Sequence, residues 1–246
     1  MSRVRRGGPH VEVLPGAGSV SRRAAAELAA LLRRRGGKTL LLASGRTMAP
    51  IYRDLARLHR TGAAPFAKAE TFNLDELRVA PDDPRSFRSF MERHLFSRVD
   101  LARERIHFLN GNAPDPEREC ARYEREISAR AVDLALVGIG VNGHVAYLEP
   151  GASLAPRTGR VRLSKTTRAR LAADGMRPVP REALTVGLET LLASCRILLV
   201  ATGREKAAAV AEALRGPISA RCPASFLSLH PALTLLLDRA AARRLD

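Results

Sequence analysis

Apolar, strand-like segments alternate with amphipathic, helix-like segments along most of this chain, and this alternation limits its fold more than any other feature. Residues 132–137 form a continuous apolar run, which is typical of a strand buried inside a parallel sheet. The alternation predicts a doubly wound α/β fold, with a mostly parallel sheet flanked by helices. Because no repeat or linker divides residues 1–246, we expect a single domain. The expected strands are 11–14, 39–43, 70–74, 105–109, 132–137, 196–201 and 233–237.

The helices are expected from apolar spacing and from capping residues. Ser21 is expected to cap a helix that stops at Gly36, and Asp115 to start a later one. Residues 151–182, which hold several prolines, are expected to be irregular. Residues 1–10 are expected to form a flexible basic arm. Further helices are expected after Pro50 and near 87–95, 184–192 and 205–214.

The net charge of +16 raises the question of a nucleic-acid partner. Only four of the 41 basic residues are lysines, and the arginines are dispersed along the expected helices. The chain has no tryptophan and three tyrosines, so it offers few platforms on which bases could stack. We therefore favour a solvated basic surface over a polyanion site and do not expect nucleic acid as a partner. The positive field would still attract anionic substrates.

The sequence shows no membrane or secretion signal. No apolar run approaches the roughly 20 residues that a bilayer-spanning helix needs. The basic start is not followed by the apolar stretch of a signal peptide. Cys120, Cys195 and Cys222 lie far apart, without metal-like or disulfide-rich spacing. We therefore expect a cytoplasmic protein without a membrane partner.

Ligands of open α/β sheets bind beyond the carboxyl ends of the strands, which directs attention to four loops, at 44–48, 73–78, 138–149 and 202–206. Residues 138–143 match the Gly-x-Gly-x-x-Gly fingerprint of dinucleotide sites. That fingerprint also needs a helix directly after it and an acidic residue about 20 positions later, and neither is present. We expect these glycines to bring the backbone close to a different ligand.

Two of these loops carry candidates for proton transfer. His144 follows a strand, with Asn142 and Glu149 nearby in sequence, an arrangement suited to a general acid or base oriented by a carboxylate. A structural histidine is the alternative. Asp75 and Glu76 are adjacent on an extended segment, so one is expected to face the cleft and the other a structural partner. A simple capping turn is the alternative.

The other two loops carry candidates for anion binding. The turn Ser-Gly-Arg-Thr at 44–47 offers backbone N–H groups and a helix N-terminus. Lys206 lies in the first turn of an expected helix, where a cation opposes the helix dipole, so a role in gripping a phosphate is indicated. A solvated surface lysine is the alternative.

Taken together, these loops resemble the glucosamine-6-phosphate deaminase family, within the wider sugar-phosphate isomerase and 6-phosphogluconolactonase superfamily. The resemblance runs from about residue 39 to residue 238. It rests on several ordered motifs: Phe-Asn-Leu-Asp-Glu at 72–76, Leu-Asn-Gly-Asn-Ala-Pro-Asp at 109–115, Asn-Gly-His-Val-Ala at 142–146, Glu-Pro-Gly at 149–151 and Ala-Leu-Thr-Val-Gly at 183–187.

The resemblance implies conversion of glucosamine 6-phosphate to fructose 6-phosphate and ammonia. It implies that His144, supported by Asn142 and Glu149, opens the sugar ring, and that Asp75 carries a proton between C2 and C1. It implies an amino-sugar phosphate as the small-molecule partner, with no metal and no organic cofactor, and leaves a homo-oligomer open. The positions that match phosphate contacts of the family are Ser44, Gly45, Thr47, Arg168 and Lys206.

The chain also departs from the family pattern. Arg46 stands in the phosphate turn where a glycine is usual, Leu148 replaces the asparagine before Glu-Pro, and Leu77 replaces a tyrosine. Residues 75–84 look more like the lactonase branch. Two alternatives therefore remain: hydrolysis of a sugar-phosphate lactone, as in 6-phosphogluconolactonase, and a catalytically silent sugar-phosphate or polyanion binder.

Overall fold

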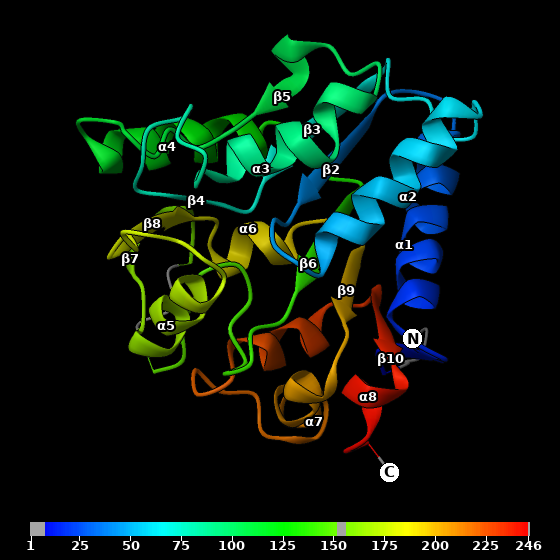
Figure 1. Ribbon diagram of the computed structural model, residues 1–246, viewed down its shortest axis with the longest axis vertical. Coiled ribbons are helices and arrows are strands. Elements are labelled where there is room, and N and C mark those ends of the chain that lie inside the picture. The colour runs from blue at the N-terminus through cyan, green and yellow to red at the C-terminus, as the bar shows by residue number, and fades with distance from the viewer. Residues whose placement is uncertain (1–7, 152–155, 246) are drawn as a thin grey trace, which may run out of the picture.

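The computed structural model describes residues 8–151 and 156–245, and its centre is a parallel sheet (Figure 1). In these two stretches seven strands pair side by side in the order β1-β10-β9-β6-β2-β3-β5, and every pairing is parallel. The α/β fold predicted from the sequence is confirmed. The strands are β1 (His10–Leu14), β2 (Lys38–Leu42), β3 (Ala69–Asn73), β5 (Ile106–His107), β6 (Leu134–Gly138), β9 (Ile197–Ala201) and β10 (Leu233–Asp238).

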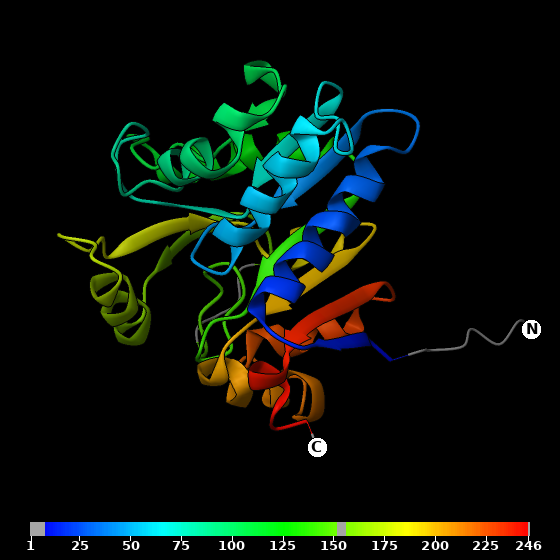
Figure 2. The ribbon, with the colours of Figure 1, turned by 45° about the vertical axis from the view of Figure 1, so that its right-hand side comes forward.

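The helices cover both faces of the sheet. The path from β1 to β2, β3 and β5 runs one way across the sheet, and the path back through β6, β9 and β10 runs the other way. Right-handed crossovers therefore place the helices of the two paths on opposite faces. On the first face, α1 (Ala17–Leu32) and α2 (Met48–Arg60) lie side by side (Figure 2). The remaining helices between strands of this sheet are α3 (Phe87–His94), α4 (Pro116–Ser128), α6 (Leu188–Leu192) and α7 (Ala207–Arg215), and α8 (Arg239–Ala242) follows β10.

The core lies between the sheet and these helices. Leu40, Leu41 and Leu42 of β2 are fully buried, because this strand is covered on both faces. From α4, Tyr123 packs edge-on against Phe72 of β3 and donates a hydrogen bond to the carbonyl oxygen of Asn73. None of the helices within residues 8–151 and 156–245 combines the length and the apolar character needed to cross a membrane.

A second, smaller sheet lies beside the central one, at the left of Figure 1. It joins β4 (Asp75–Leu77), β8 (Glu182–Thr185) and β7 (Gly159–Arg162) in antiparallel pairs, with α5 (Lys165–Ala173) between β7 and β8 in sequence. The prediction that residues 151–182 are irregular is therefore wrong for the residues of β7 and α5, and residues 152–155 lie outside the described part. The helix expected at 184–192 begins only at Leu188, because Leu184 belongs to β8.

The structure can be compared with two expected helix caps and with the expected N-terminal arm. Ser21 does not cap α1, which starts four residues earlier. Its buried hydroxyl instead donates to Asp54 of α2 at 2.6 Å. Asp115 does cap α4, accepting from the backbone N–H of Arg118 at 3.0 Å. Of the basic arm expected at 1–10, residues 1–7 lie outside the described part, and His10 begins β1.

Candidate active site

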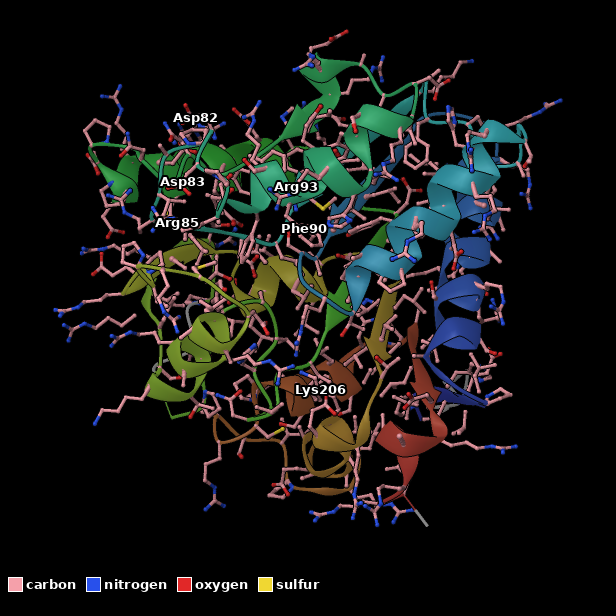
Figure 3. The ribbon with its side chains drawn as sticks, in the orientation of Figure 1. Asp82, Asp83, Arg85, Phe90, Arg93 and Lys206 are labelled. Atoms are coloured by element: carbon pink, nitrogen blue, oxygen red, sulfur yellow. The ribbon has the colours of Figure 1, made fainter. Side chains whose placement is uncertain are left out.

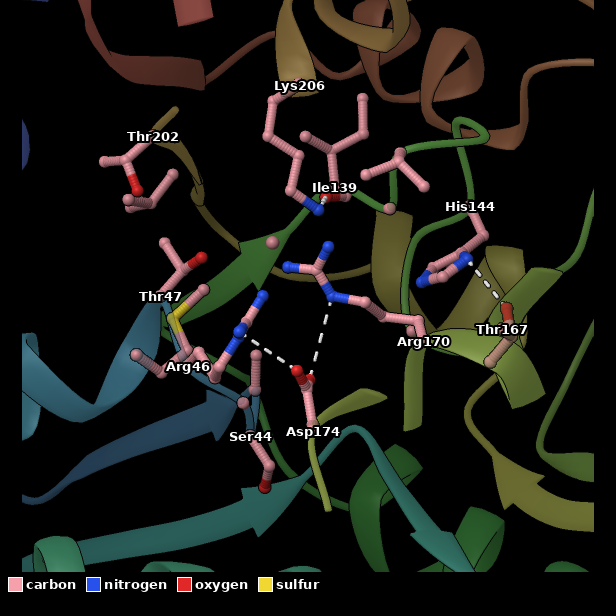
Figure 4. Close-up of a pocket in the computed structure, with 18 of the residues that line it drawn as sticks. Ser44, Arg46, Thr47, Ile139, His144, Thr167, Arg170, Asp174, Thr202 and Lys206 are labelled. Atoms are coloured by element: carbon pink, nitrogen blue, oxygen red, sulfur yellow. Dashed lines mark hydrogen bonds and ion pairs between the residues drawn. The ribbon is translucent and has the colours of Figure 1, made fainter. Parts of the chain in front are cut away.

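The cavity lies at the point where the sheet changes direction. β2 and β6 are neighbours, but the chain leaves them toward opposite sides, so the loops after their carboxyl ends diverge. A cavity of about 480 Å³ fills the space between these loops (Figure 4). Its lining also includes the start of β4, one face of α5 and the loop after β9. All four loops singled out from the sequence contribute residues to it.

Asp75 and Glu76 face different ways, as expected for neighbours on a strand. Asp75 is buried and lines the cavity. Burial raises the pKa of Asp75 to about 8, and the nearby charge of Glu76 adds to the shift. Glu76 turns away and accepts hydrogen bonds from three backbone N–H groups, those of Leu77, Phe87 and Arg88. It therefore holds the first turn of α3, while Asp75 is free to meet a ligand.

His144 belongs to a hydrogen-bonded group of side chains. Its Nδ1 lies 3.6 Å from Oε2 of Glu149, and Thr167 of α5 approaches the same nitrogen at 3.5 Å. The side-chain amide of Asn142 donates to Glu149 at 3.0 Å. Burial acts to raise the pKa of Glu149, but hydrogen bonds from His144, Thr167 and Asn142 outweigh it and lower the pKa to about 2. Glu149 is therefore a carboxylate that orients the imidazole.

Two glycines of residues 138–143 make room for side chains of the protein itself, whereas the glycines of a dinucleotide site make room for the ligand. A Cβ on Gly140 would lie 2.4 Å from atoms of the His144 ring, so this glycine lets the imidazole lie against its own loop. Gly143 has a φ of +86°, and a Cβ there would lie 2.8 Å from Sγ of Cys222. Contrary to expectation, at Gly140 the close approach is made by His144 rather than left for a ligand.

The end of the cavity that faces α2 and α7 is basic. Gly45, with a φ of +114°, turns the chain from β2 into α2, so that the N-terminus of α2 opens on the cavity beside Ser44 and Thr47. Lys206 reaches in from the start of α7, and its Nζ donates to the carbonyl oxygen of Ile139 at 2.6 Å (Figure 4). Burial lowers the pKa of Lys206. This end of the cavity is suited to an anion.

One face of α5 forms a wall of the cavity. Thr167, Arg170, Leu171 and Asp174 recur at helical spacing and all line it. Arg168 points about 100° further round the helix than Thr167 and is not among the lining residues. Its Nε is buried, without a hydrogen-bond partner among the described residues. Of the nine residues predicted for the site, Glu149 and Arg168 are not among the lining residues, but Glu149 contacts His144 and Asn142, which are.

Several lining residues were missed by the sequence reasoning. Thr167, Arg170 and Asp174 lie in the segment that was expected to be irregular. Ser164, whose hydroxyl accepts from the N–H of Thr167 at 3.1 Å, was the one local signal for this helix. Tyr147 also lines the cavity, with its ring 6.1 Å from that of His144, and nothing in the sequence around it set it apart.

Comparison with known proteins agrees with this geometry. The model of the family described as glucosamine-6-phosphate isomerases/6-phosphogluconolactonase matches residues 16–235. The chain belongs to this family. The resemblance inferred from the sequence motifs is thereby confirmed.

Relatives within the family carry one name repeatedly. Glucosamine-6-phosphate deaminase 1 of Giardia intestinalis is 43% identical over 224 residues, which is 89% of this chain and 84% of the relative. The glucosamine-6-phosphate deaminase of Rhodopirellula baltica is 40% identical, covering 96% of both chains. A solved structure described as a monomeric glucosamine-6-phosphate deaminase is 40% identical, with a TM-score of 0.92, over 96% of this chain and 99% of that one.

The lactonase branch is similar to this chain at lower identity. The structure of 6-phosphogluconolactonase from Thermotoga maritima is 26% identical, with a TM-score of 0.75, over 93% of this chain and 99% of that one.

Proposed function

We propose that this chain is a glucosamine-6-phosphate deaminase, which converts glucosamine 6-phosphate to fructose 6-phosphate and ammonia by isomerisation coupled to deamination. The observation that carries the proposal is that one cavity is lined both by groups that can transfer protons and by groups that can bind a phosphate. The buried Asp75 and the group around His144 supply proton transfer, and Lys206 lies at a basic wall suited to a phosphate. Relatives at about 40% identity that bear this name support it.

Ring opening is assigned to His144. A closed pyranose opens when a proton leaves the C1 hydroxyl and a proton reaches the ring oxygen, and one imidazole can do both in turn. Glu149 and Asn142 hold the ring of His144 in place, and the negative charge of Glu149 stabilises the imidazolium formed midway.

Proton transfer between carbons is assigned to Asp75. In the open chain, the Asp75 carboxylate removes the proton at C2 while the aldehyde oxygen O1 gains a proton, which gives an enolamine. A proton is then delivered to C1 and one leaves the nitrogen, which gives an imine at C2 and a hydroxyl at C1. Water then adds to the imine, and ammonia leaves with fructose 6-phosphate as the other product. A carboxyl whose pKa is raised to about 8 is a stronger base than an ordinary aspartate, and it can still ionise near neutral pH.

Phosphate binding is assigned to the turn after β2 and to α7. Ser44, Gly45 and Thr47 would offer hydroxyl and N–H donors, and Lys206 a point charge. We keep Arg168 as a predicted phosphate contact. Reaching the phosphate would require its side chain to move into the cavity, because the lining does not include it in this structure.

The test is ammonia release from glucosamine 6-phosphate, run beside hydrolysis of 6-phosphogluconolactone with the same protein. We expect ammonia release and no lactone hydrolysis above the spontaneous rate. Lactone hydrolysis without ammonia release would assign the chain to the other branch. Inactivity on both substrates, with fructose 6-phosphate still bound, would leave a silent sugar-phosphate binder.

A further inference from the structure

The carboxylate of Asp174 lies between two arginines at the basic end of the cavity (Figure 4). Its Oδ1 is 3.0 Å from an Nη of Arg46, which belongs to the turn after β2. Its Oδ2 is 3.7 Å from Nε of Arg170 on α5. The charge of Asp174 also acts on Lys206, as does that of Arg46. Asp174 therefore pairs with two arginines in the region that suits a phosphate, and Glu205, which also lines the cavity, is the stronger counter-charge of Lys206.

Asp174 is held in this position weakly. It follows the last residue of α5, where the helix dipole disfavours a negative charge. The Arg46 side chain is 64% exposed and that of Asp174 is 27% exposed, so water competes with their ion pair. A phosphate dianion offers the same arginines more charge and more acceptor oxygens than one carboxylate does.

We propose that Arg46 and Arg170 bind the phosphate of the substrate, and that Asp174 is an internal anion which the phosphate displaces. The proposal rests on the proposed function, because it takes a sugar phosphate as the ligand. It gives a role to Arg46, which stands where the family pattern has a glycine, and to Arg170, which lines the cavity where Arg168 does not.

The competing explanation is that Asp174 is a fixed brace between the turn after β2 and α5. The two explanations predict opposite signs. Removing a brace loosens the site and weakens phosphate binding. Removing a competing anion frees the guanidinium groups of Arg46 and Arg170 and tightens phosphate binding.

The experiment measures the dissociation constants of inorganic phosphate and of fructose 6-phosphate by calorimetry. Wild type, Asp174→Asn, Arg46→Ala and the double variant are compared. We expect Asp174→Asn to tighten both ligands about three- to tenfold and Arg46→Ala to weaken them about tenfold. In the Arg46→Ala background, the gain from Asp174→Asn should shrink to less than about twofold, because one of the two freed arginines is absent.

Two controls separate displacement from other effects of charge. Asp82→Asn removes an exposed carboxylate far from Lys206 (Figure 3) and should leave both constants unchanged. Arg35→Ala removes an exposed arginine outside the cavity and serves the same purpose for Arg46→Ala. Unchanged or weaker binding in Asp174→Asn overturns the proposal in favour of the brace. An equal gain in both backgrounds overturns it in favour of a general field effect.

Failure of this proposal is distinguishable from failure of the proposed function, because binding is measured without turnover. Ammonia release by the wild type, together with no tightening in Asp174→Asn, removes the role of Asp174 and leaves the deaminase. Tightening that depends on Arg46, together with no ammonia release by the wild type, keeps the anion site and removes the deaminase.

Discussion

Asp75 and Glu76 are chemically alike and adjacent, yet backbone alternation sends one into the cavity and the other to the start of α3. That division could be predicted, because it follows from strand geometry alone. The raised pKa of Asp75 could not, because it depends on burial by segments distant in sequence. The identity of a residue therefore indicates which chemistry it can perform, and the fold sets the pKa that determines its strength as an acid or base.

Asp75→Asn should make the protein more stable at high pH. The folded-state pKa of about 8 lies above the ordinary value of 3.8, so ionising Asp75 costs folded-state stability as the pH rises from about 4 through 8. The asparagine variant avoids that cost. Since one pKa unit corresponds to about 1.4 kcal/mol, we expect a gain of at least about 1 kcal/mol above pH 8 and none near pH 4. Urea unfolding of the wild type and of Asp75→Asn at pH 4 and at pH 8.5 measures this gain. Equal free energies of unfolding of the two proteins at pH 8.5 would contradict the raised pKa.

Gly140→Ala should reduce turnover without unfolding the protein. Its new Cβ would lie 2.4 Å from the His144 ring, so the imidazole must leave its position beside Glu149. We expect kcat to fall about 10²-fold, the size of effect of a misplaced acid or base. Gly18→Ala in α1 is the matched control, since its Cβ would meet its nearest atom at 3.5 Å, and it should keep full activity. Full activity in Gly140→Ala would show that catalysis does not depend on the position of His144 beside Glu149.

At the scale of elements, the strands and helices of the central sheet could be predicted and the small sheet could not. The inner strands β6, β9 and β10 are apolar, mostly buried runs, which a sequence displays directly. β7 has four residues that alternate between half-buried and exposed, and α5 turns one face to a cavity rather than to the core. Neither therefore carries the apolar pattern by which such elements are recognised.

Glu76→Gln should act on α3 and on Asp75 at once. The amide accepts hydrogen bonds through one oxygen, so at least one backbone N–H of α3 loses its partner, at a cost of about 1–3 kcal/mol. Burial raises the pKa of Glu76 to about 7, so above that pH the loss of its buried charge offsets part of this cost. Removing the charge of Glu76 also lowers the pKa of Asp75. The rise of kcat/KM with pH, which requires the Asp75 carboxylate, should therefore move to lower pH. Titration of the substrate is the same in both enzymes and cancels in the comparison.

Ser86→Ala is the matched control for that prediction. Ser86 caps the same helix, through a hydrogen bond from the N–H of Ser89, but carries no charge. It should cost about 1 kcal/mol of stability and leave the pH profile in place. A profile that shifts equally in both variants would show that the shift comes from loosening α3 rather than from the charge of Glu76.

At the scale of the whole molecule, the charge of +16 bears on how the substrate arrives. A positive field speeds the encounter with a phosphorylated sugar, and salt screens that field. We expect kcat/KM to fall several-fold between about 20 and 300 mM NaCl, while kcat stays nearly constant. A duplex DNA titrated at 150 mM salt should bind weakly, and tight, strongly salt-dependent binding would revive the polyanion alternative.

The position of the site could be predicted because it follows from topology. Parallel strands that reverse their order create a crevice at their carboxyl ends, and Asp75, His144 and Lys206 all follow or begin strands at that edge. Arg168 shows where such reasoning ends. A motif gives a residue's place along a helix, whereas the side of the helix that faces the cavity depends on how that helix packs.

The most direct test of the account is deuterium incorporation at C1 of fructose 6-phosphate, with ammonium present, in heavy water. Wild type should place deuterium at C1, because Asp75 exchanges its proton with solvent between its transfers at the two carbons. Asp75→Asn should bind the sugar and lose this exchange by about 10²–10⁴-fold. Exchange at the wild-type rate in Asp75→Asn would contradict the assignment of Asp75 as the base.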